Sequence, residues 1–157
     1  MIFHHKLTTK AGTFSYISTQ KLTSPHINLL FFTAMGIGCS YFDFYGLVNE
    51  LPQTINCLCV DLLGSGSSSQ PHNLKRNSQN IVQEITIFLN QLPLNEVYLC
   101  CHSFSSLYLL ATLHQATLNT NIKGFISIDP TTVEIMKSYT DPFQDSLEES
   151  QPRPIDS

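Results

Sequence analysis

Short apolar runs that suit buried strands alternate with segments of helical spacing along most of this chain. The runs expected to be strands covered on both faces are residues 27–33, 54–61, 96–101 and 122–128. The segments between them that are expected to be helices are residues 41–51, 75–92 and 104–117. Two further strands, residues 2–8 and 13–18, are expected to form a hairpin around Lys10-Ala11-Gly12. This rhythm predicts an α/β fold: a mostly parallel twisted sheet with right-handed crossovers, an N-terminal antiparallel hairpin and helices on both faces.

One domain accounts for the length of the chain. Its 157 residues are close to the roughly 150 residues of an ordinary domain. Since 42% of the residues are hydrophobic, the chain can bury a core, which is expected within residues 1–136. Residues 137–157 contain three prolines and few core-forming residues, so they are expected to be an acidic, disordered tail.

Charge and cysteine content argue against several classes of protein. The net charge is −4 and no basic patch suggests nucleic acid. The five cysteines are an odd number and no secretory signal opens the chain, so reduced thiols and a cytoplasmic location are expected. Cys57 and Cys59 lie two residues apart on an expected strand without a second Cys or His pair, which favours a core role over a metal site. No apolar run approaches the roughly 20 residues that span a bilayer, and no cofactor is expected.

Three loops of unusual composition each follow an expected strand. They are residues 33–38 (TAMGIG), 61–68 (DLLGSGSS) and 100–106 (CCHSFSS). In open parallel sheets, ligands bind at the loops beyond the carboxyl ends of the strands. The three loops are therefore expected to meet at one edge of the sheet and to form the functional site.

Taken in order, these loops resemble the N-terminal portion of an α/β-hydrolase, and the resemblance covers residues 2–130. Residues 35–38 resemble the family's oxyanion loop, and residues 61–68 resemble its Asp-x-x-Gly-x-Gly-x-Ser segment. Residues 101–106 resemble the nucleophile elbow, which is usually written G-x-S-x-G and is often followed by a further glycine. The resemblance implies a serine esterase or acyl-hydrolase that acts on a small-molecule ester or acyl substrate.

The resemblance also implies roles for single residues. Ser103 would be the nucleophile, and the Ile37 and Phe104 N–H groups would form the oxyanion hole. Asp129 follows the last expected strand, where some relatives keep the catalytic acid. The residues that support the motifs are Gly36, Gly38, His102 and Ser105.

A catalytic base is missing from this pattern. In the family, the acid and the histidine follow the nucleophile along the chain. The only histidine after Ser103 is His114. An expected helix would place it about 16 Å away, at about 1.5 Å per residue. His72, in the loop after the fourth strand, is expected to be a solvated loop residue. The sequence therefore predicts an apparently truncated hydrolase whose activity is weak or absent.

Two other interpretations stay open. The chain can be a non-catalytic α/β binding module or relic that keeps the sheet without the chemistry. A Rossmann-like nucleotide-binding domain is the weaker alternative, because Gly36-x-Gly38 follows a strand but Tyr41 stands at the third glycine position of G-x-G-x-x-G. A truncated hydrolase would also leave strand 122–128 at an open, apolar edge of the sheet, where self-association is expected.

Overall fold

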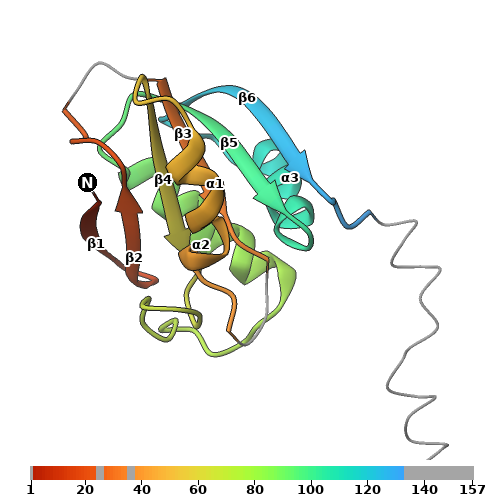
Figure 1. The fold of residues 1–157 in the computed structure, drawn as a ribbon. Helices are drawn as coiled ribbons and strands as arrows, with labels where there is room; N and C mark the ends of the chain where they lie inside the picture. Colours follow the sequence, from red (N-terminus) through yellow and green to blue (C-terminus); the bar gives the residue numbers. More distant parts are fainter. Residues whose placement is uncertain (1, 24–26, 35–37, 133–157) are drawn as a thin grey trace, which may run out of the picture.

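The computed structural model describes residues 2–23, 27–34 and 38–132, which form one six-stranded sheet with helices on both faces (Figure 1). The strands are β1 (Phe3–Thr9), β2 (Gly12–Ser18), β3 (Ile27–Phe32), β4 (Ile55–Asp61), β5 (Glu96–His102) and β6 (Asn121–Ile128). The helices are the 3-10 helix η1 (Tyr41–Phe44) and the α-helices α1 (Tyr45–Glu50), α2 (Ser78–Gln91) and α3 (Ser105–Gln115). The predicted fold class, including the N-terminal hairpin, is confirmed.

The order of the strands in the sheet is β1-β2-β4-β3-β5-β6. β1 and β2 pair antiparallel around the turn at Lys10 and Ala11, and β2 is also antiparallel to β4. β3 lies parallel between β4 and β5, and β6 is parallel to β5. Because these four strands are parallel, their carboxyl ends lie at one edge of the sheet, as the alternation of strands and helices predicts.

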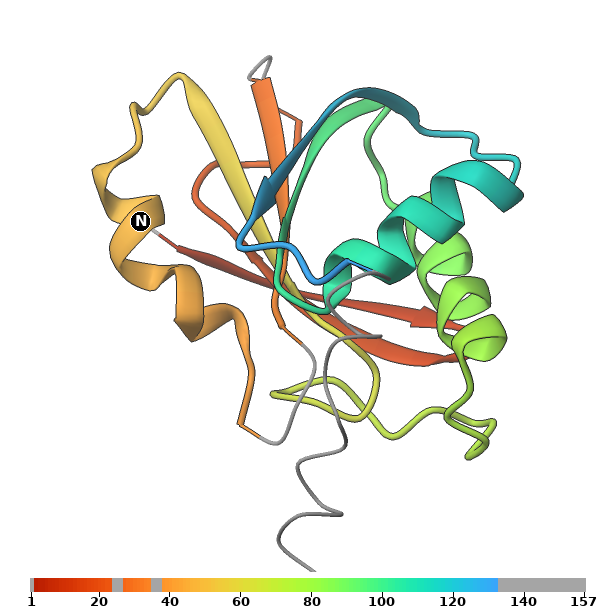
Figure 2. The same cartoon turned by 90° about the vertical axis from the view of Figure 1, so that its right-hand side faces the viewer.

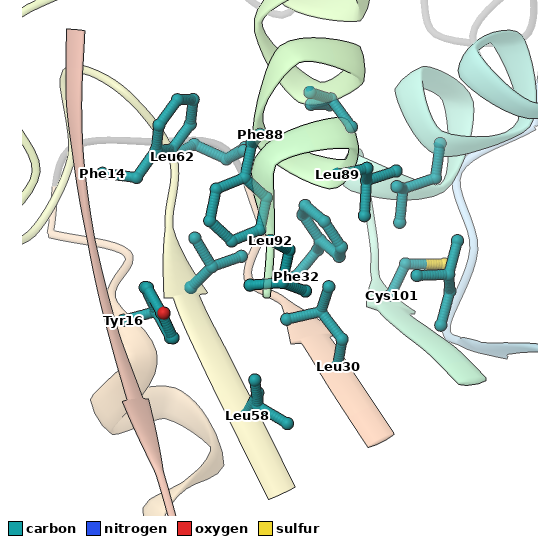
Figure 3. Packing of buried hydrophobic residues seen from close by; sticks show 14 of the residues in the cluster. Phe14, Tyr16, Leu30, Phe32, Leu58, Leu62, Phe88, Leu89, Leu92 and Cys101 are labelled. Carbon is teal, nitrogen blue, oxygen red and sulfur yellow. The ribbon is translucent and has the colours of Figure 1, made fainter. Parts of the chain in front are cut away.

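Helices α2 and α3 cover one face of the sheet (Figure 2). The centre of this layer is Phe88 of α2, whose ring lies 4.8 Å from that of Phe14 and 6.3 Å from that of Phe32 (Figure 3). α2 begins at Ser78, three residues later than the predicted start at residue 75. The reason is the cap: the Asn77 side chain accepts a hydrogen bond of 2.9 Å from the Asn80 N–H.

The opposite face is covered by η1 and α1, which pack over a second apolar cluster (Figure 2). The sequence predicts one helix over residues 41–51, whereas the structure has a 3-10 turn followed by a short α-helix. Tight first turns are common at helix N-termini. The helix ends at Glu50, because Leu51 precedes a proline and takes an extended conformation. Cys57 and Cys59 are buried beneath these helices, so their predicted core role is confirmed.

β6 lies at an edge of the sheet. Within the described part of the chain it pairs only with β5, and its Ile126 side chain is 47% exposed. The predicted tail at residues 137–157 lies outside the described residues. Among the described residues, none of the helices combines the length and the apolar character needed to cross a membrane.

Candidate active site

Ser103 lies on the sharp turn between β5 and α3, at the carboxyl edge of the sheet. Its backbone φ is 53°, in the left-handed region that residues other than glycine rarely adopt. The Ser103 N–H donates to the Ile128 carbonyl at 3.0 Å, and the Ser103 carbonyl accepts from the Ser106 and Thr131 N–H groups at 3.1 and 3.3 Å. These bonds hold the strained conformation between α3 and the end of β6.

Small residues flank Ser103 in the positions where the elbow pattern has glycine. The Cys101 and Ser105 side chains are both fully buried, and the turn forms with both of them in place. Cys101 Sγ lies 3.6 Å from the Ile126 carbonyl and 3.4 Å from Ser127 Oγ. Neither side chain therefore prevents the turn, and both make contacts that glycine could not make.

The predicted oxyanion hole is described only in part. Phe104 precedes α3, so its N–H belongs to the first-turn donors that helix geometry leaves without an intrahelical acceptor. Ile37, the other predicted contributor, and Gly36, which supports the motif, lie outside the described residues. Gly38 has a φ of 91°, which glycine adopts without strain. Of the two predicted donors, the structure therefore describes only the Phe104 N–H.

The carboxylate of Asp61, at the end of β4, joins the loop that follows β4 to the start of η1. It accepts the Tyr41 N–H at 2.7 Å and the Ser67 N–H at 2.7 Å, and it is fully buried. Burial raises the pKa of Asp61, and the two N–H donors oppose this shift. Gly66, at a φ of 50°, packs against the same carboxylate so closely that a Cβ would collide with it. Asp61 therefore fixes the start of η1 relative to the serine-rich loop.

The sequence analysis missed a buried hydroxyl at the same edge. Thr33 directly follows β3, is fully buried, and its Oγ1 has no hydrogen-bond partner, the one such buried side-chain atom in the described part of the chain. A buried polar atom without a partner is uncommon and requires a reason. The sequence shows a threonine beside the glycines of this loop, but it does not show that the hydroxyl is buried without a partner.

Asp129 and His102 lie at the paired carboxyl ends of β6 and β5, where His102 is opposite Ile128. Asp129 follows β6, is exposed and has a φ of 44°. His102 is half-buried at the end of β5, with its ring 6.4 Å from that of Phe44 and nearly perpendicular to it. This contact gives His102 a packing role beside η1.

The two other histidines that were considered as possible bases are His114 and His72. His114 is in the last turn of α3. His72 is exposed, and its Nδ1 lies 3.1 Å from the Lys10 carbonyl, at the turn between β1 and β2. His72 lines a polar pocket of about 400 Å³ between that turn and α2, and the residues lining this pocket do not include Ser103. The interpretation of His72 as a loop residue agrees with this position.

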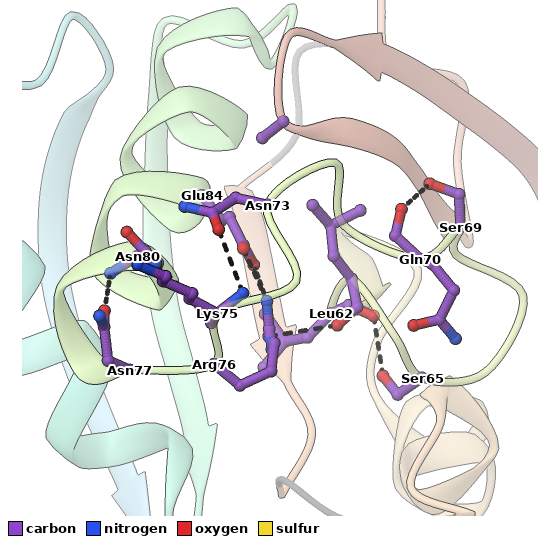
Figure 4. A network of polar contacts seen from close by, with 12 residues as sticks. Leu62, Ser65, Ser69, Gln70, Asn73, Lys75, Arg76, Asn77, Asn80 and Glu84 are labelled. Carbon is purple, nitrogen blue, oxygen red and sulfur yellow. Dashed lines mark hydrogen bonds and ion pairs between the residues drawn. The ribbon is translucent and has the colours of Figure 1, made fainter.

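An ion pair fixes the loop after β4 to α2. The Arg76 Nη1 lies 2.6 and 2.8 Å from the two carboxylate oxygens of Glu84, and Nη2 donates to the Leu63 carbonyl at 3.3 Å (Figure 4). The Glu84 side chain is 8% exposed. This pair stabilises the path of the loop that follows β4.

Cys57 and Cys100 are two of the four buried cysteines, and both have strongly raised pKa values. Burial raises the pKa of Cys57 to about 11 and that of Cys100 to about 12, so both thiols stay protonated at neutral pH. No group of three or more possible metal ligands occurs among residues 2–23, 27–34 and 38–132.

Comparison with known proteins identifies the fold around this elbow. A family model described as the alpha/beta hydrolase fold matches residues 29–153. The chain belongs to the alpha/beta hydrolase fold family. This match favours the hydrolase interpretation over the nucleotide-binding one. A search of curated protein sequences gave no match.

Solved structures with the same fold are distant in sequence. Smu.1393c from Streptococcus mutans superposes with a TM-score of 0.70 at 21% identity, over 95% of this chain and 54% of that one. A bacterial membrane phospholipase A superposes with a TM-score of 0.69 at 17% identity, over 96% of this chain and 46% of that one. A haloalkane dehalogenase variant from Bradyrhizobium elkanii superposes with a TM-score of 0.67 at 16% identity, over 81% of this chain and 40% of that one. This chain spans about half the length of the solved structures that it matches.

Proposed function

We propose that Ser103 is the nucleophile of a serine hydrolase that acts on small ester or acyl substrates. The observation that carries the proposal is the left-handed conformation of Ser103, at a φ of 53°, on the turn from β5 into α3. Backbone strain of this kind persists where the surroundings enforce it, and it clusters at reactive residues. In an alpha/beta hydrolase, such a turn exposes the serine hydroxyl above the sheet.

We further propose that the Phe104 and Ile37 N–H groups stabilise the oxyanion. Phe104 is adjacent to the nucleophile at the start of α3, where free N–H groups favour negative charge. Ile37 belongs to the glycine-containing loop between Gly36 and Gly38. The contacts of Asp61 with the Tyr41 and Ser67 N–H groups support this assignment, because they fix the segment that follows the loop.

Asp129 is our candidate for the catalytic acid, because it directly follows β6 and Ser103 donates its N–H to the neighbouring Ile128 carbonyl. A serine also needs a general base to become nucleophilic, and in this family the base is a histidine. After Ser103 the sequence has only His114, eleven residues further along and in the last turn of α3. We therefore expect these 157 residues alone to hydrolyse activated esters slowly or not at all.

The test is covalent labelling of the folded chain with a fluorophosphonate, followed by mapping of the adduct by mass spectrometry. We expect slow labelling at Ser103 and none in Ser103→Ala. The matched control is Ser67→Ala, which removes an exposed serine hydroxyl from the loop after β4. Labelling confined to another serine would refute the assignment. Rapid ester hydrolysis that Ser103→Ala abolishes would show that a base is present after all.

The second candidate function is that of a non-catalytic binding module. The observation that favours it is the position of His114, the single histidine after Ser103. A folded chain that fluorophosphonate does not label, even at high reagent concentration, would support this function.

We also propose that the chain self-associates through β6. This strand pairs only with β5 in the described part of the chain and exposes Ile126, and open apolar edges pair with other chains. Light scattering after size-exclusion chromatography should show an oligomer for the natural chain and a smaller species for Ile126→Lys. A stable, monodisperse monomer of the natural chain would contradict the proposal.

A further inference from the structure

Two consecutive serines, Ser105 and Ser106, open α3 directly after the turn that carries Ser103. Both side chains are fully buried. The elbow pattern has glycine at position 105 and often another at position 106, and glycine can make no side-chain contact there. In this chain, each position instead carries a hydroxyl group at the base of the nucleophile turn.

The Ser105 hydroxyl connects the turn to the end of β3. Its Oγ lies 2.8 Å from the His102 carbonyl oxygen and 3.2 Å from the Phe32 carbonyl oxygen. The same oxygen accepts the His102 N–H at 3.2 Å. Phe32 is the last residue of β3, immediately before the loop that contains Ile37, one of the two proposed oxyanion residues. Ser105 therefore joins the nucleophile turn to the base of that loop.

The Ser106 hydroxyl makes the corresponding connection on the other side. Its Oγ lies 2.7 Å from the Ser103 carbonyl oxygen and 3.1 Å from the Thr131 carbonyl oxygen. The Thr131 N–H in turn donates to the Ser103 carbonyl at 3.3 Å. Thr131 lies two residues after Asp129, in the segment that follows β6. Ser106 therefore joins the nucleophile turn to the segment of the proposed acid.

A purely local explanation covers only half of these contacts. Serine side chains near a helix start commonly bond a carbonyl three or four residues earlier, and the contacts to His102 and Ser103 are of that kind. The contacts to Phe32 and Thr131 differ, because their partners belong to two other segments of the chain. The two serines thus reach in opposite directions from one turn of helix.

We propose that Ser105 and Ser106 are positioning residues that hold the nucleophile in register with both flanking loops. Ser105 sets the turn against the end of β3, and Ser106 sets it against the segment that carries Asp129. The inference rests on the proposed function of Ser103. The connection between the segments, however, can be measured without any reaction at Ser103.

The experiment compares Ser105→Gly and Ser106→Gly, which remove the hydroxyl groups and install the residue that the elbow pattern has. The matched control is Ser65→Ala, because the Ser65 hydroxyl also donates to a carbonyl three residues earlier, that of Leu62 at 2.9 Å, but in another loop. Amide hydrogen exchange, followed by NMR, is measured at Thr33 and Ala34 after β3 and at Thr131 after β6. If either glycine variant fails to fold, the corresponding alanine variant takes its place.

We expect each variant to loosen one side only. Ser105→Gly should speed exchange at Thr33 and Ala34, and Ser106→Gly should speed it at Thr131, by about fivefold or more for the loss of one hydrogen bond. Both variants should also slow fluorophosphonate labelling of Ser103 by about tenfold or more, because displacements of about 1 Å at a reacting group are costly. Ser65→Ala should change none of these rates.

The outcomes separate the two proposals. Exchange that is unchanged at both loops, or that changes equally at both in each variant, would overturn the positioning role. If exchange shows the expected one-sided pattern but fluorophosphonate does not label the chain, Ser103 is not the nucleophile. The connection of the turn to its two flanking segments would still be supported. The one-sided pattern together with slower labelling supports both.

Discussion

We expect the Ser103→Gly variant of the chain to be more stable than the Ser103→Ala variant, although the natural residue is serine. At a φ of 53°, a residue with a Cβ pays about 1–2 kcal/mol for its left-handed backbone. Glycine avoids this cost but loses about 0.5–1 kcal/mol through the greater freedom of its unfolded chain. We therefore expect Ser103→Gly to exceed Ser103→Ala by about 1 kcal/mol in the free energy of unfolding. The difference measures the strain at the proposed nucleophile.

Equilibrium unfolding in urea measures this difference. With a denaturant dependence of about 2 kcal/mol per molar, the midpoint of Ser103→Gly should lie about 0.5 M above that of Ser103→Ala. Gln83, exposed within α2, provides the control: there glycine should be less stable than alanine by about 1 kcal/mol. If Ser103→Gly is also less stable than Ser103→Ala, the turn is not strained. The backbone conformation of Ser103 would then no longer support its proposed role as nucleophile.

Three further predictions concern the surroundings of the site. Gly66→Ala should destabilise the fold by about 2–4 kcal/mol in urea unfolding, because of its left-handed φ and the collision of a Cβ with the Asp61 carboxylate. Gly46→Ala in α1, where a Cβ meets nothing within 4 Å, should be neutral or stabilising, and a similar loss there would contradict the argument. Thr33→Val should raise the melting temperature, because the buried Thr33 hydroxyl has no partner and such a group destabilises the fold by about 1–3 kcal/mol. A lower melting temperature of Thr33→Val would show that the hydroxyl is hydrogen-bonded. Burial, with a smaller contribution from His4, lowers the pKa of His5 below 6.5, so the unfolded chain binds the proton first on acidification. The natural chain should therefore lose stability as pH falls below 6.5, and His5→Gln should lose less; equal losses in urea titrations across this range would refute the role of His5.

Most of the fold could be predicted from the sequence, because each strand is an apolar run between polar or glycine-rich loops. Residues 122–128 were expected as a strand and the structure has Asn121–Ile128. Helix boundaries were harder to predict. The start of α2 depends on the hydrogen bond from the Asn80 N–H to Asn77, and several polar residues before it could have served as the cap.

The candidate site could likewise be predicted from the sequence only in part. The position of Ser103 followed from the motif, but the hydrogen bonds that hold it come from Ile128 and Thr131, far along the chain and with backbone groups that have no sequence signature. The buried Thr33 hydroxyl was equally invisible, since whether a hydroxyl has a partner depends on packing. Contacts within one loop could be inferred from its residue types, whereas contacts between loops required coordinates.

The bond from the Ser103 N–H to the Ile128 carbonyl also sets an order of events during synthesis. Translation adds about 5–20 residues per second, so the ribosome delivers Ile128 on the order of seconds after Ser103. A nascent chain that stops before β6 lacks the acceptor for this N–H, and its turn is free to relax into ordinary backbone. The left-handed conformation of Ser103 is therefore one of the last features of this sheet to form.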